Sequence, residues 1–148
     1  MKYAVREANG LDAIRILENL REEEKREIRK SGADVTSAVL RSFAYSDGAF
    51  VLTENDKAIM MFGVYAPLIG VPQVWALGTP ACNDCKKLMV RWGRSVTNAL
   101  LKQYGRLENW CDCDFKASLR WLRLIGFKVE DPVDGFCHLH AEVEQCAS

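Results

Sequence analysis

The sequence predicts an α/β fold, built as a mixed, mostly antiparallel sheet of about seven strands with helices on both faces. Three observations predict it. Short apolar or alternating stretches between Gly, Pro and Asn-Asp turns mark strands. Stretches with apolar residues three or four apart mark amphipathic helices. The two kinds of element follow one another in the order βααβββαβαββ, which is typical of a sheet covered by helices.

The amino-terminal elements are one strand and two helices. Lys2–Ala8 alternates apolar and polar residues and predicts the first strand. A helix is expected to follow and to run into the charged stretch REEEKREIRK, which we interpret as a solvated helix face. Ser31–Asp34 breaks this helix and caps a second one. The apolar stripe of the first helix is expected to comprise Leu11, Ile14, Leu17 and Leu20.

Three strands and a long helix are predicted next. The strands are Gly48–Glu54, Lys57–Tyr65 and Gln73–Thr79. The helix is expected from Asp84 to about Tyr104, and Gly105 ends it. Its apolar positions at helical spacing are Cys85, Leu88, Trp92, Val96 and Ala99.

The carboxyl-terminal elements are a strand, a short helix and two closing strands. RLENWCD predicts the strand, and FKASLRWLRLI predicts a helix whose other side carries Lys116, Arg120 and Arg123. Gly126 supplies a left-handed cap that lets Phe127 fold back on the last turn. The closing strands lie around 127–130 and 136–143, joined by the turn DPVDG. The inward residues of the short helix are Phe115, Leu119, Leu122 and Ile125.

Length and composition predict one soluble globular domain over residues 1–148. Hydrophobic residues make up 49% of the chain and charged residues 27%. Twenty basic residues balance twenty acidic ones, so no net charge attracts nucleic acid or a membrane. The basic side of the short helix can touch nucleic acid or an acidic partner, or can simply be solvated.

No membrane span or secretion signal is expected. The start, MKYAVREANG, lacks an apolar signal core. The 26-residue uncharged segment Ala58–Asn83 is interrupted by glycines and prolines, so it predicts buried strands and a turn. We therefore expect an intracellular protein with reduced cysteines.

The element order and the stretch SLRWLRLIGFKVED resemble the GNAT superfamily of acetyl-CoA-dependent acyltransferases. In that superfamily a short helix ends in a Gly-Phe pair before the sixth strand, as at Gly126 and Phe127. The carboxyl-terminal half also resembles small GNAT-like proteins of tailed bacteriophages, including an internal virion protein of short-tailed phages. The shared residues are Val74, Trp75 and Leu77, LLKQYGRLENW and SLRWLRLIGF. This resemblance implies a location in the host cytoplasm or the virion.

The resemblance implies a site between the fourth and fifth strands, where acetyl-CoA enters in that superfamily. Its pyrophosphate sits on the helix after the fourth strand, where a glycine-rich loop exposes backbone N–H groups. Here GTPACNDCKK has no second glycine, and Asn83 or Asp84 is expected to cap the helix and occupy those groups. The tyrosine that often serves the superfamily as general acid corresponds to Leu122, and the asparagine that often contacts the cofactor corresponds to Phe115. The general base is frequently a carboxylate on the fourth strand, and QVWALGT carries none.

Two hypotheses follow. In the first, the chain has lost acetyl transfer, binds no cofactor, and has a structural or interaction role in a virion or its assembly, with protein partners. Phe115, Trp110 and Trp75 then fill the gap between the strands. In the second, the chain is an active N-acetyltransferase with a divergent loop. Its catalytic residues remain unidentified, and acetyl-CoA is held by Leu77, Gly78, Cys85, Lys86 and Lys87.

Cysteines and histidines leave further alternatives. Cys82 and Cys85, with Cys111 and Cys113, can meet at the carboxyl ends of the fourth and fifth strands as a metal or redox site. The favoured interpretation is ordinary core thiols, without a metal. His138 and His140 face the same side of the last strand, as a base, as ligands, or as the polar side of an alternating strand.

Overall fold

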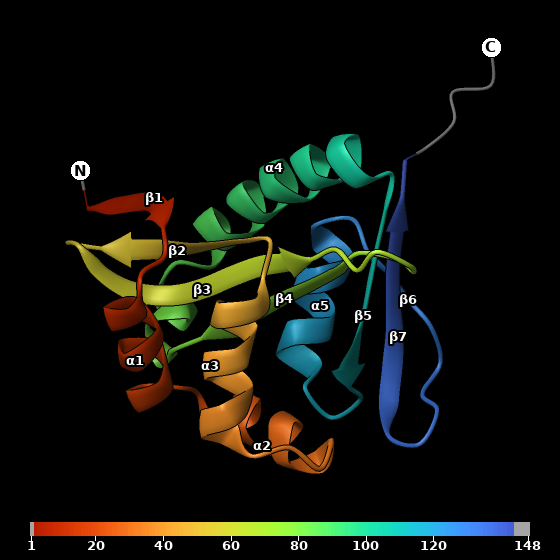
Figure 1. The fold of residues 1–148 in the computed structure, drawn as a ribbon, viewed down its shortest axis with the longest axis horizontal. Helices are drawn as coiled ribbons and strands as arrows, with labels where there is room; N and C mark the ends of the chain where they lie inside the picture. The colour runs from red at the N-terminus through yellow and green to blue at the C-terminus, as the bar shows by residue number, and fades with distance from the viewer. Residues whose placement is uncertain (1, 144–148) are drawn as a thin grey trace. The chain divides into compact units, whose positions relative to one another are not determined.

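A computed structural model describes residues 2–143 as five α-helices, one 3₁₀ helix and seven strands. The strand order is β1-β2-β3-β4-β5-β7-β6, and the pairing is mostly antiparallel (Figure 1). The predicted fold class is therefore confirmed. The elements are β1 Tyr3–Glu7, α1 Gly10–Glu18, α2 Glu22–Lys30, α3 Val35–Tyr45, β2 Gly48–Glu54, β3 Lys57–Tyr65, β4 Gln73–Gly78, η1 Pro80–Asp84, α4 Lys86–Tyr104, β5 Arg106–Asp112, α5 Lys116–Leu124, β6 Lys128–Val129 and β7 Phe136–Glu142.

The chain divides into two compact units. The first ends at Ala66 and resumes over Val74–Lys86, and the second comprises Pro67–Gln73 and continues from Lys87. The expectation of a single domain stays a prediction. Over residues 2–143, no helix combines the length and the apolarity needed to cross a membrane.

β1, β2 and β3 pair in antiparallel fashion in the first unit, with α1 and α3 beside them (Figure 1). The turn between β2 and β3 uses Asn55 and Asp56 with φ of 50° and 68°. Two left-handed residues match the natural twist of a hairpin. Ala58–Met61 of β3 are buried one after another, as the uncharged stretch predicts.

The core stripe of α1 differs from the prediction. Leu11 is 78% exposed and Ile14 46%, whereas Ala13 and Ile16 are fully buried. A capping box between Asn9 and Asp12 fixes the start of the helix, and a 2.6 Å ion pair draws Asp12 toward Arg6 of β1. These contacts set the rotation of the helix. Leu20 is buried as predicted, and Leu17 is half-buried.

The first unit has three helices where the sequence predicted two. The expected first helix breaks after α1, because Arg21 is extended (φ −62°, ψ 149°). The backbone N–H of Arg21 donates to the carbonyl of Gly78 at 3.1 Å, so this break is held by a tertiary contact. α2 then carries the charged stretch, and its buried residue is Glu24.

The second unit pairs β5, β7 and β6 in antiparallel fashion. Alternate residues of β7 are buried, and β5 buries Leu107, Cys111 and Asp112. The indole N–H of Trp121 in α5 donates to the carbonyl of Met89 in α4 at 3.0 Å. Gly126 has φ of 116°, and the N–H of Phe127 donates to the carbonyl of Leu122. Phe127 is 6% exposed, so the predicted helix end is confirmed.

The long helix α4 starts at Lys86 and not at Asp84, because Pro80–Asp84 forms the 3₁₀ helix η1. Its buried positions are Met89, Gly93 and Thr97, and Ala99 is exposed. The predicted stripe is therefore rotated by one position, which brings a glycine against α5. Gly105 ends the helix as predicted, with φ of 80°.

Candidate functional site

The carboxyl end of β4 is the position at which the sequence predicted a site. Gly78 is the last residue of β4, and both of its backbone groups are used by the start of α2. Its N–H donates to Glu24 Oε1 at 3.0 Å, and its carbonyl accepts from the N–H of Arg21 at 3.1 Å. The N–H of the next residue, Thr79, donates instead to the carbonyl of Ile59 in β3. The end of β4 is thus hydrogen-bonded to β3 through Thr79 and to Arg21 and Glu24 through Gly78.

A buried ion pair holds this arrangement. Arg21 Nη2 lies 2.6 Å from Glu24 Oε1, and the two side chains are 14% and 4% exposed. Burial raises the pKa of Glu24 to about 7, although Arg21 and the N–H of Gly78 oppose that rise. Burial alone would lower the pKa of Arg21, but the carboxylate of Glu24 raises it overall. The pair therefore sits where ionisation of the carboxyl is costly.

Gly78 suits this position because a side chain would collide with Arg21. A Cβ on Gly78 would lie 2.8 Å from Arg21 Nη2 and 3.0 Å from Arg21 Cζ. The absence of a side chain therefore lets the guanidinium lie directly on the strand.

The connection from β4 to α4 does not form the loop that a phosphate would need. Pro80 has no N–H, the N–H of Cys82 donates to Thr79, and the N–H of Cys85 donates to Cys82. A 3₁₀ helix uses the backbone amides between these positions in the same way. The N–H groups of Cys82 and Cys85 are therefore already bonded within the connection.

The predicted capping of α4 by Asn83 or Asp84 is wrong. Both residues lie within η1 and are exposed. Within the described part of the chain, neither side chain accepts a hydrogen bond from a backbone amide of α4. The residues that bond to the end of β4 come instead from α2, which lies far away in the sequence.

The five predicted cofactor-binding residues lie in one stretch around η1. Leu77 and Gly78 are buried at the end of β4, Cys85 is buried after η1, and Lys86 and Lys87 are exposed at the start of α4. Burial raises the pKa of Cys85. Their role in holding a cofactor stays a prediction.

Two residues at this site escaped the sequence analysis, Arg21 and Glu24. They belong to a stretch of nine consecutive residues from Arg21 to Arg29 of which only Ile28 is uncharged. Nothing in such a charged stretch indicates which one of its carboxylates is buried. A carboxylate does therefore lie at the end of the fourth strand, although β4 itself carries none.

The positions matched to the superfamily's polar residues carry apolar side chains. Phe115 precedes α5 and is 5% exposed, and Leu122 is half-buried on α5. Trp75 packs against the core of the first unit and donates to Ser46 Oγ. Trp110 is 50% exposed, so the prediction that it is a buried filler is wrong. Filling by Phe115 and Trp75 stays a prediction.

The two cysteine pairs belong to different units, and a metal or redox site formed by all four sulfurs stays a hypothesis beside the favoured interpretation of core thiols. Burial raises the pKa of Cys82 to about 11, and its Sγ donates to the carbonyl of Ile59 at 3.3 Å. A thiol in that state is not a ready metal ligand. These features favour the interpretation of Cys82 as a core residue.

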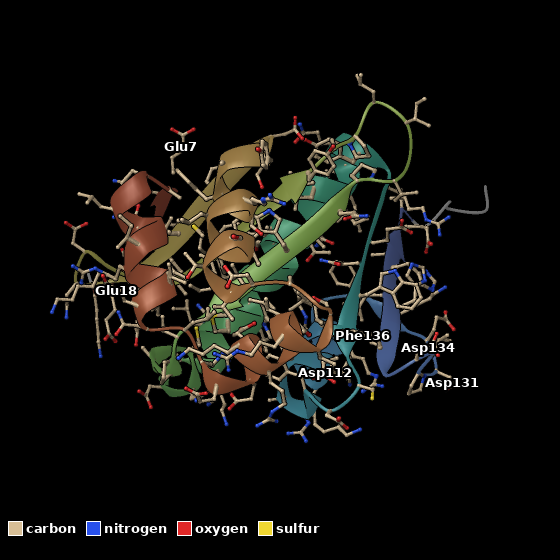
Figure 2. The ribbon with its side chains drawn as sticks, turned by 60° about the horizontal axis from the view of Figure 1, so that its bottom comes forward. Glu7, Glu18, Asp112, Asp131, Asp134 and Phe136 are labelled. Atoms are coloured by element: carbon tan, nitrogen blue, oxygen red, sulfur yellow. The ribbon has the colours of Figure 1, made fainter. Side chains whose placement is uncertain are left out.

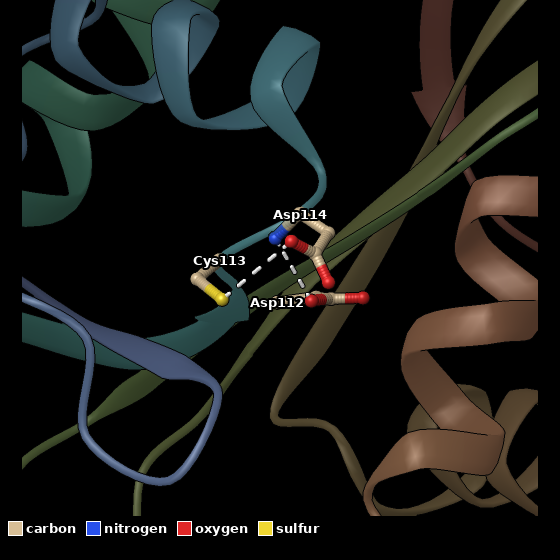
Figure 3. A group of neighbouring side chains, drawn as sticks. All are labelled: Asp112, Cys113 and Asp114. Atoms are coloured by element: carbon tan, nitrogen blue, oxygen red, sulfur yellow. Dashed lines mark hydrogen bonds between the residues drawn. The ribbon is translucent and has the colours of Figure 1, made fainter.

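A compact group of possible ligands follows β5, where one atom from each of Asp112, Cys113 and Asp114 lies within 4.8 Å of the others (Figure 3). The N–H of Asp114 donates to Asp112 Oδ1 at 3.0 Å, which is the hydrogen bond of an Asx turn. Adjacent positions in the sequence and this turn account for the closeness of the three side chains.

The histidines of β7 face the same side, as predicted, and both are paired with carboxylates. His138 Nε2 lies 3.2 Å from Glu108 Oε2, and Trp110 packs beside its ring. His140 bridges Glu130 at 2.6 Å and Glu142 at 2.9 Å, and these hydrogen bonds raise its pKa. Two further carboxylates, Asp131 and Asp134, lie on the β6–β7 connection (Figure 2).

Comparison with known proteins identifies the fold. No protein-family model matches the sequence, and no curated protein matches it. Solved structures do match. The aminoglycoside acetyltransferase AAC(6′)-Ib in complex with paromomycin and acetyl-CoA has a TM-score of 0.70 and 18% identity, over 100% of this chain and 99% of that chain.

Two further structures agree. A GNAT-family acetyltransferase from Bacillus anthracis has a TM-score of 0.71 and 12% identity, over 98% of this chain and 97% of that chain. The paia N-acetyltransferase of Thermoplasma acidophilum in complex with coenzyme A has a TM-score of 0.65 and 13% identity, over 96% and 99%. The chain therefore has the GNAT fold.

Proposed function

We propose that this chain is a GNAT-fold protein that does not transfer acetyl groups and that has a structural or interaction role in a bacteriophage particle or its assembly. The observation that carries the loss of activity is the bonding of Gly78. Its N–H and carbonyl are both taken by Arg21 and Glu24 of the same chain. An acetyl-CoA molecule seated on this strand would find its backbone partners already used.

Further features support the loss of cofactor binding. The connection over Pro80–Asp84 is a 3₁₀ helix in which Pro80 has no N–H and the N–H of Cys82 is bonded to Thr79, so it offers few amides to a pyrophosphate. Leu122 and Phe115 offer no proton and no hydrogen bond. The phage role rests on the resemblance of the carboxyl-terminal half to small virion proteins. Protein partners, rather than a small substrate, are the expected ligands.

A second candidate is an N-acetyltransferase that acts on an amine. The observation that favours it is Glu24, whose carboxyl lies at the end of β4 with a pKa of about 7. A general base is most useful when its pKa is near the working pH. Lys86 and Lys87 would then contact the phosphates of acetyl-CoA. Solved proteins of the same fold bind acetyl-CoA or coenzyme A.

Isothermal titration calorimetry with acetyl-CoA and with coenzyme A separates the two candidates. No heat of binding at millimolar ligand is expected, with AAC(6′)-Ib as the positive control. A dissociation constant in the micromolar range would overturn the loss of cofactor binding. A variant with Lys86→Glu and Lys87→Glu would then tell whether the bound ligand occupies the predicted site.

The particle role needs its own test. Mass spectrometry of particles and assembly intermediates, purified after infection by a phage that carries this gene, is expected to detect the chain. An interrupted gene should reduce the yield of infectious particles. Absence of the chain from both fractions would overturn the role in the particle.

A further inference from the structure

Helices α4 and α5 carry basic residues and no acidic ones. Eight of the twenty Lys and Arg residues of the chain lie on them, five on α4 and three on α5, whereas none of the twenty Asp and Glu residues does. The charged helix α2 differs, because its four basic residues are balanced by four glutamates. A chain without net charge therefore concentrates positive charge on two of its helices.

The contact between α4 and α5 joins their basic residues into one surface. Arg94 Nε in α4 donates to the carbonyl of Leu124, the last residue of α5, at 2.9 Å. Residues three or four apart are neighbours on a helix, so Arg91 lies beside Arg94, and Arg120 lies beside both Leu124 and Arg123. We define the basic surface as five residues, all in the second unit: Arg91, Arg94, Lys116, Arg120 and Arg123.

The cations of the basic surface are available to a ligand. All five residues are exposed. Within residues 2–143, no carboxylate forms an ion pair with any of them. Charges more than about 10 Å apart are screened from one another at ordinary salt. The local positive charge, rather than the net charge of zero, therefore decides what this surface attracts.

The surroundings of the basic surface favour a phosphate backbone over an acidic protein. Protein interfaces usually depend on an apolar or aromatic centre. Over the whole of α4 and α5, Leu124 is the one exposed large apolar side chain. Phosphate contacts need no such centre, since Arg and Lys make them alone. Four of the five cations are arginines, whose planar donor fork matches phosphate oxygens.

The aromatic residues of these helices favour a duplex over a single strand. Proteins that hold single strands stack the bases on accessible aromatic rings. Trp92 and Trp121 are half-buried, and the indole N–H of Trp121 is used by the carbonyl of Met89. A duplex presents its phosphates while its bases stay stacked on one another, so it needs no aromatic partner.

We propose that the basic surface of α4 and α5 binds the phosphate backbone of a nucleic acid duplex without reading its sequence. This inference goes beyond the proposed function and does not depend on it. None of the five cations belongs to the predicted cofactor-binding residues, so the surface serves an active enzyme or a structural protein equally.

The first experiment measures binding of a short DNA duplex of mixed sequence, by fluorescence anisotropy at increasing salt. A dissociation constant of about 10 μM or tighter is expected at about 50 mM salt. Five phosphate contacts predict a slope of about −4.5 for the logarithm of the association constant against the logarithm of the salt concentration. Absence of binding at about 50 mM salt, or a slope near zero, would overturn the proposal.

The second experiment removes one cation from each helix. Arg91→Gln with Arg120→Gln leaves Arg94, which joins the helices, in place. The slope should become shallower by about 2, and binding at low salt should weaken about tenfold or more. The matched control is Arg26→Gln with Arg29→Gln, because these exposed arginines of α2 give the same change of net charge. Equal weakening by the two double variants would overturn the assignment to the basic surface.

A second pair keeps the test decisive if the first double variant does not fold. Lys116→Gln with Arg123→Gln changes two exposed cations of α5 alone and should make the slope shallower by about 2 as well. Unchanged binding by this folded variant would count against the proposal. Thermal unfolding followed by circular dichroism shows which variants are folded.

The third experiment compares the duplex with two other polyanions of similar charge. Poly-glutamate stands for an acidic protein, and a single-stranded oligonucleotide stands for an unpaired nucleic acid. The duplex is expected to bind more tightly than either. Tighter binding of poly-glutamate would overturn the proposal in favour of an acidic protein partner, and tighter binding of the oligonucleotide would overturn the duplex. Each of these outcomes leaves the proposed function standing, because calorimetry with coenzyme A and analysis of particles test that separately.

Discussion

The carboxylate of Glu24 accepts a hydrogen bond from the backbone N–H of Gly78, 54 residues further along the chain, at 3.0 Å. The same oxygen lies 2.6 Å from Arg21 Nη2. The side chain of Glu24 therefore pairs with the guanidinium of Arg21, at the break between α1 and α2, and also accepts the last backbone N–H of β4. Most of the expected behaviour of the first unit follows from this contact.

Gly78→Ala should weaken this contact without altering either charged residue. The new Cβ would lie 2.8 Å from Arg21 Nη2, so the guanidinium must move away from Glu24. We expect a loss of about 1–3 kcal/mol in the free energy of unfolding, measured by urea denaturation. Gly10→Ala is the control, because nothing lies within 4 Å of its new Cβ. Equal stabilities of the two variants would contradict the expectation.

Glu24 should make stability fall as the pH rises. Its folded pKa, about 7, is above its unfolded value of 4.5, so the folded state holds a proton that the unfolded state has released. This contribution is fully present below about pH 4.5 and is lost as the pH rises through 7. The stability of wild type relative to Glu24→Gln should fall by up to about 1.4 kcal/mol per pH unit in that window.

The same pH series for Glu23→Gln is the control for that experiment. Glu23 is exposed in the same turn, so Glu23→Gln makes the same chemical change without removing a buried carboxyl. A wild-type slope that matches the slope of Glu24→Gln would show that burial does not hold the proton on Glu24.

His140 should titrate above the ordinary histidine value of 6.5. Hydrogen bonds to Glu130 and Glu142 favour its charged form, and both bonds need a proton on each ring nitrogen. Its stabilising contribution is present below pH 6.5 and is lost as the pH rises through the raised pKa. NMR titration of the ring protons should show a lower pKa in Glu130→Gln, whereas Asp131→Asn should have little effect.

Gly93→Ala should strain the contact between α4 and α5. A Cβ there would lie 2.7 Å from Ile125 Cγ2 and 3.3 Å from the ring of Trp121. Overpacking of this kind costs about 1–3 kcal/mol, measurable by thermal or urea unfolding. Ile125→Leu removes the clashing Cγ2 methyl group and should restore part of the loss. If the second substitution does not raise the free energy of unfolding of Gly93→Ala, the contact with Ile125 is not the source of the strain.

Cys82 should react more slowly than Cys113 with iodoacetamide at neutral pH. Burial raises its pKa to about 11, so its thiolate is scarce, and it is 4% exposed. Cys113 is half-buried and should be alkylated earlier. Peptide mass spectrometry over time gives the order of reaction. Early labelling of Cys82 in the folded protein would contradict its assignment to the core.

Local patterns predicted most of the fold. The strands, the hairpin at Asn55 and the helix end at Gly126 all depend on neighbouring residues, so the sequence contains their signals. The rotation of α1 was missed because the capping box and the ion pair of Asp12 outweigh the apolar spacing of Leu11 and Ile14.

The candidate site was harder to predict because its contacts are distant in sequence. Nothing near Arg21 signals a helix break, since the residues around it favour a helix and the cause is the carbonyl of Gly78. The sequence predicts that Asn83 or Asp84 caps the long helix that follows β4. It carries no signal that the side chain of Glu24, from α2, accepts the N–H of Gly78.

The strands at the two ends of the strand order have a consequence for handling the protein at high concentration. β6 is only Lys128–Val129, and β1 is five residues long and ends in the charged pair Arg6 and Glu7. Short edge strands that carry charged side chains are poor templates for pairing with another chain. Concentrated samples should therefore resist fibril growth through these edge strands.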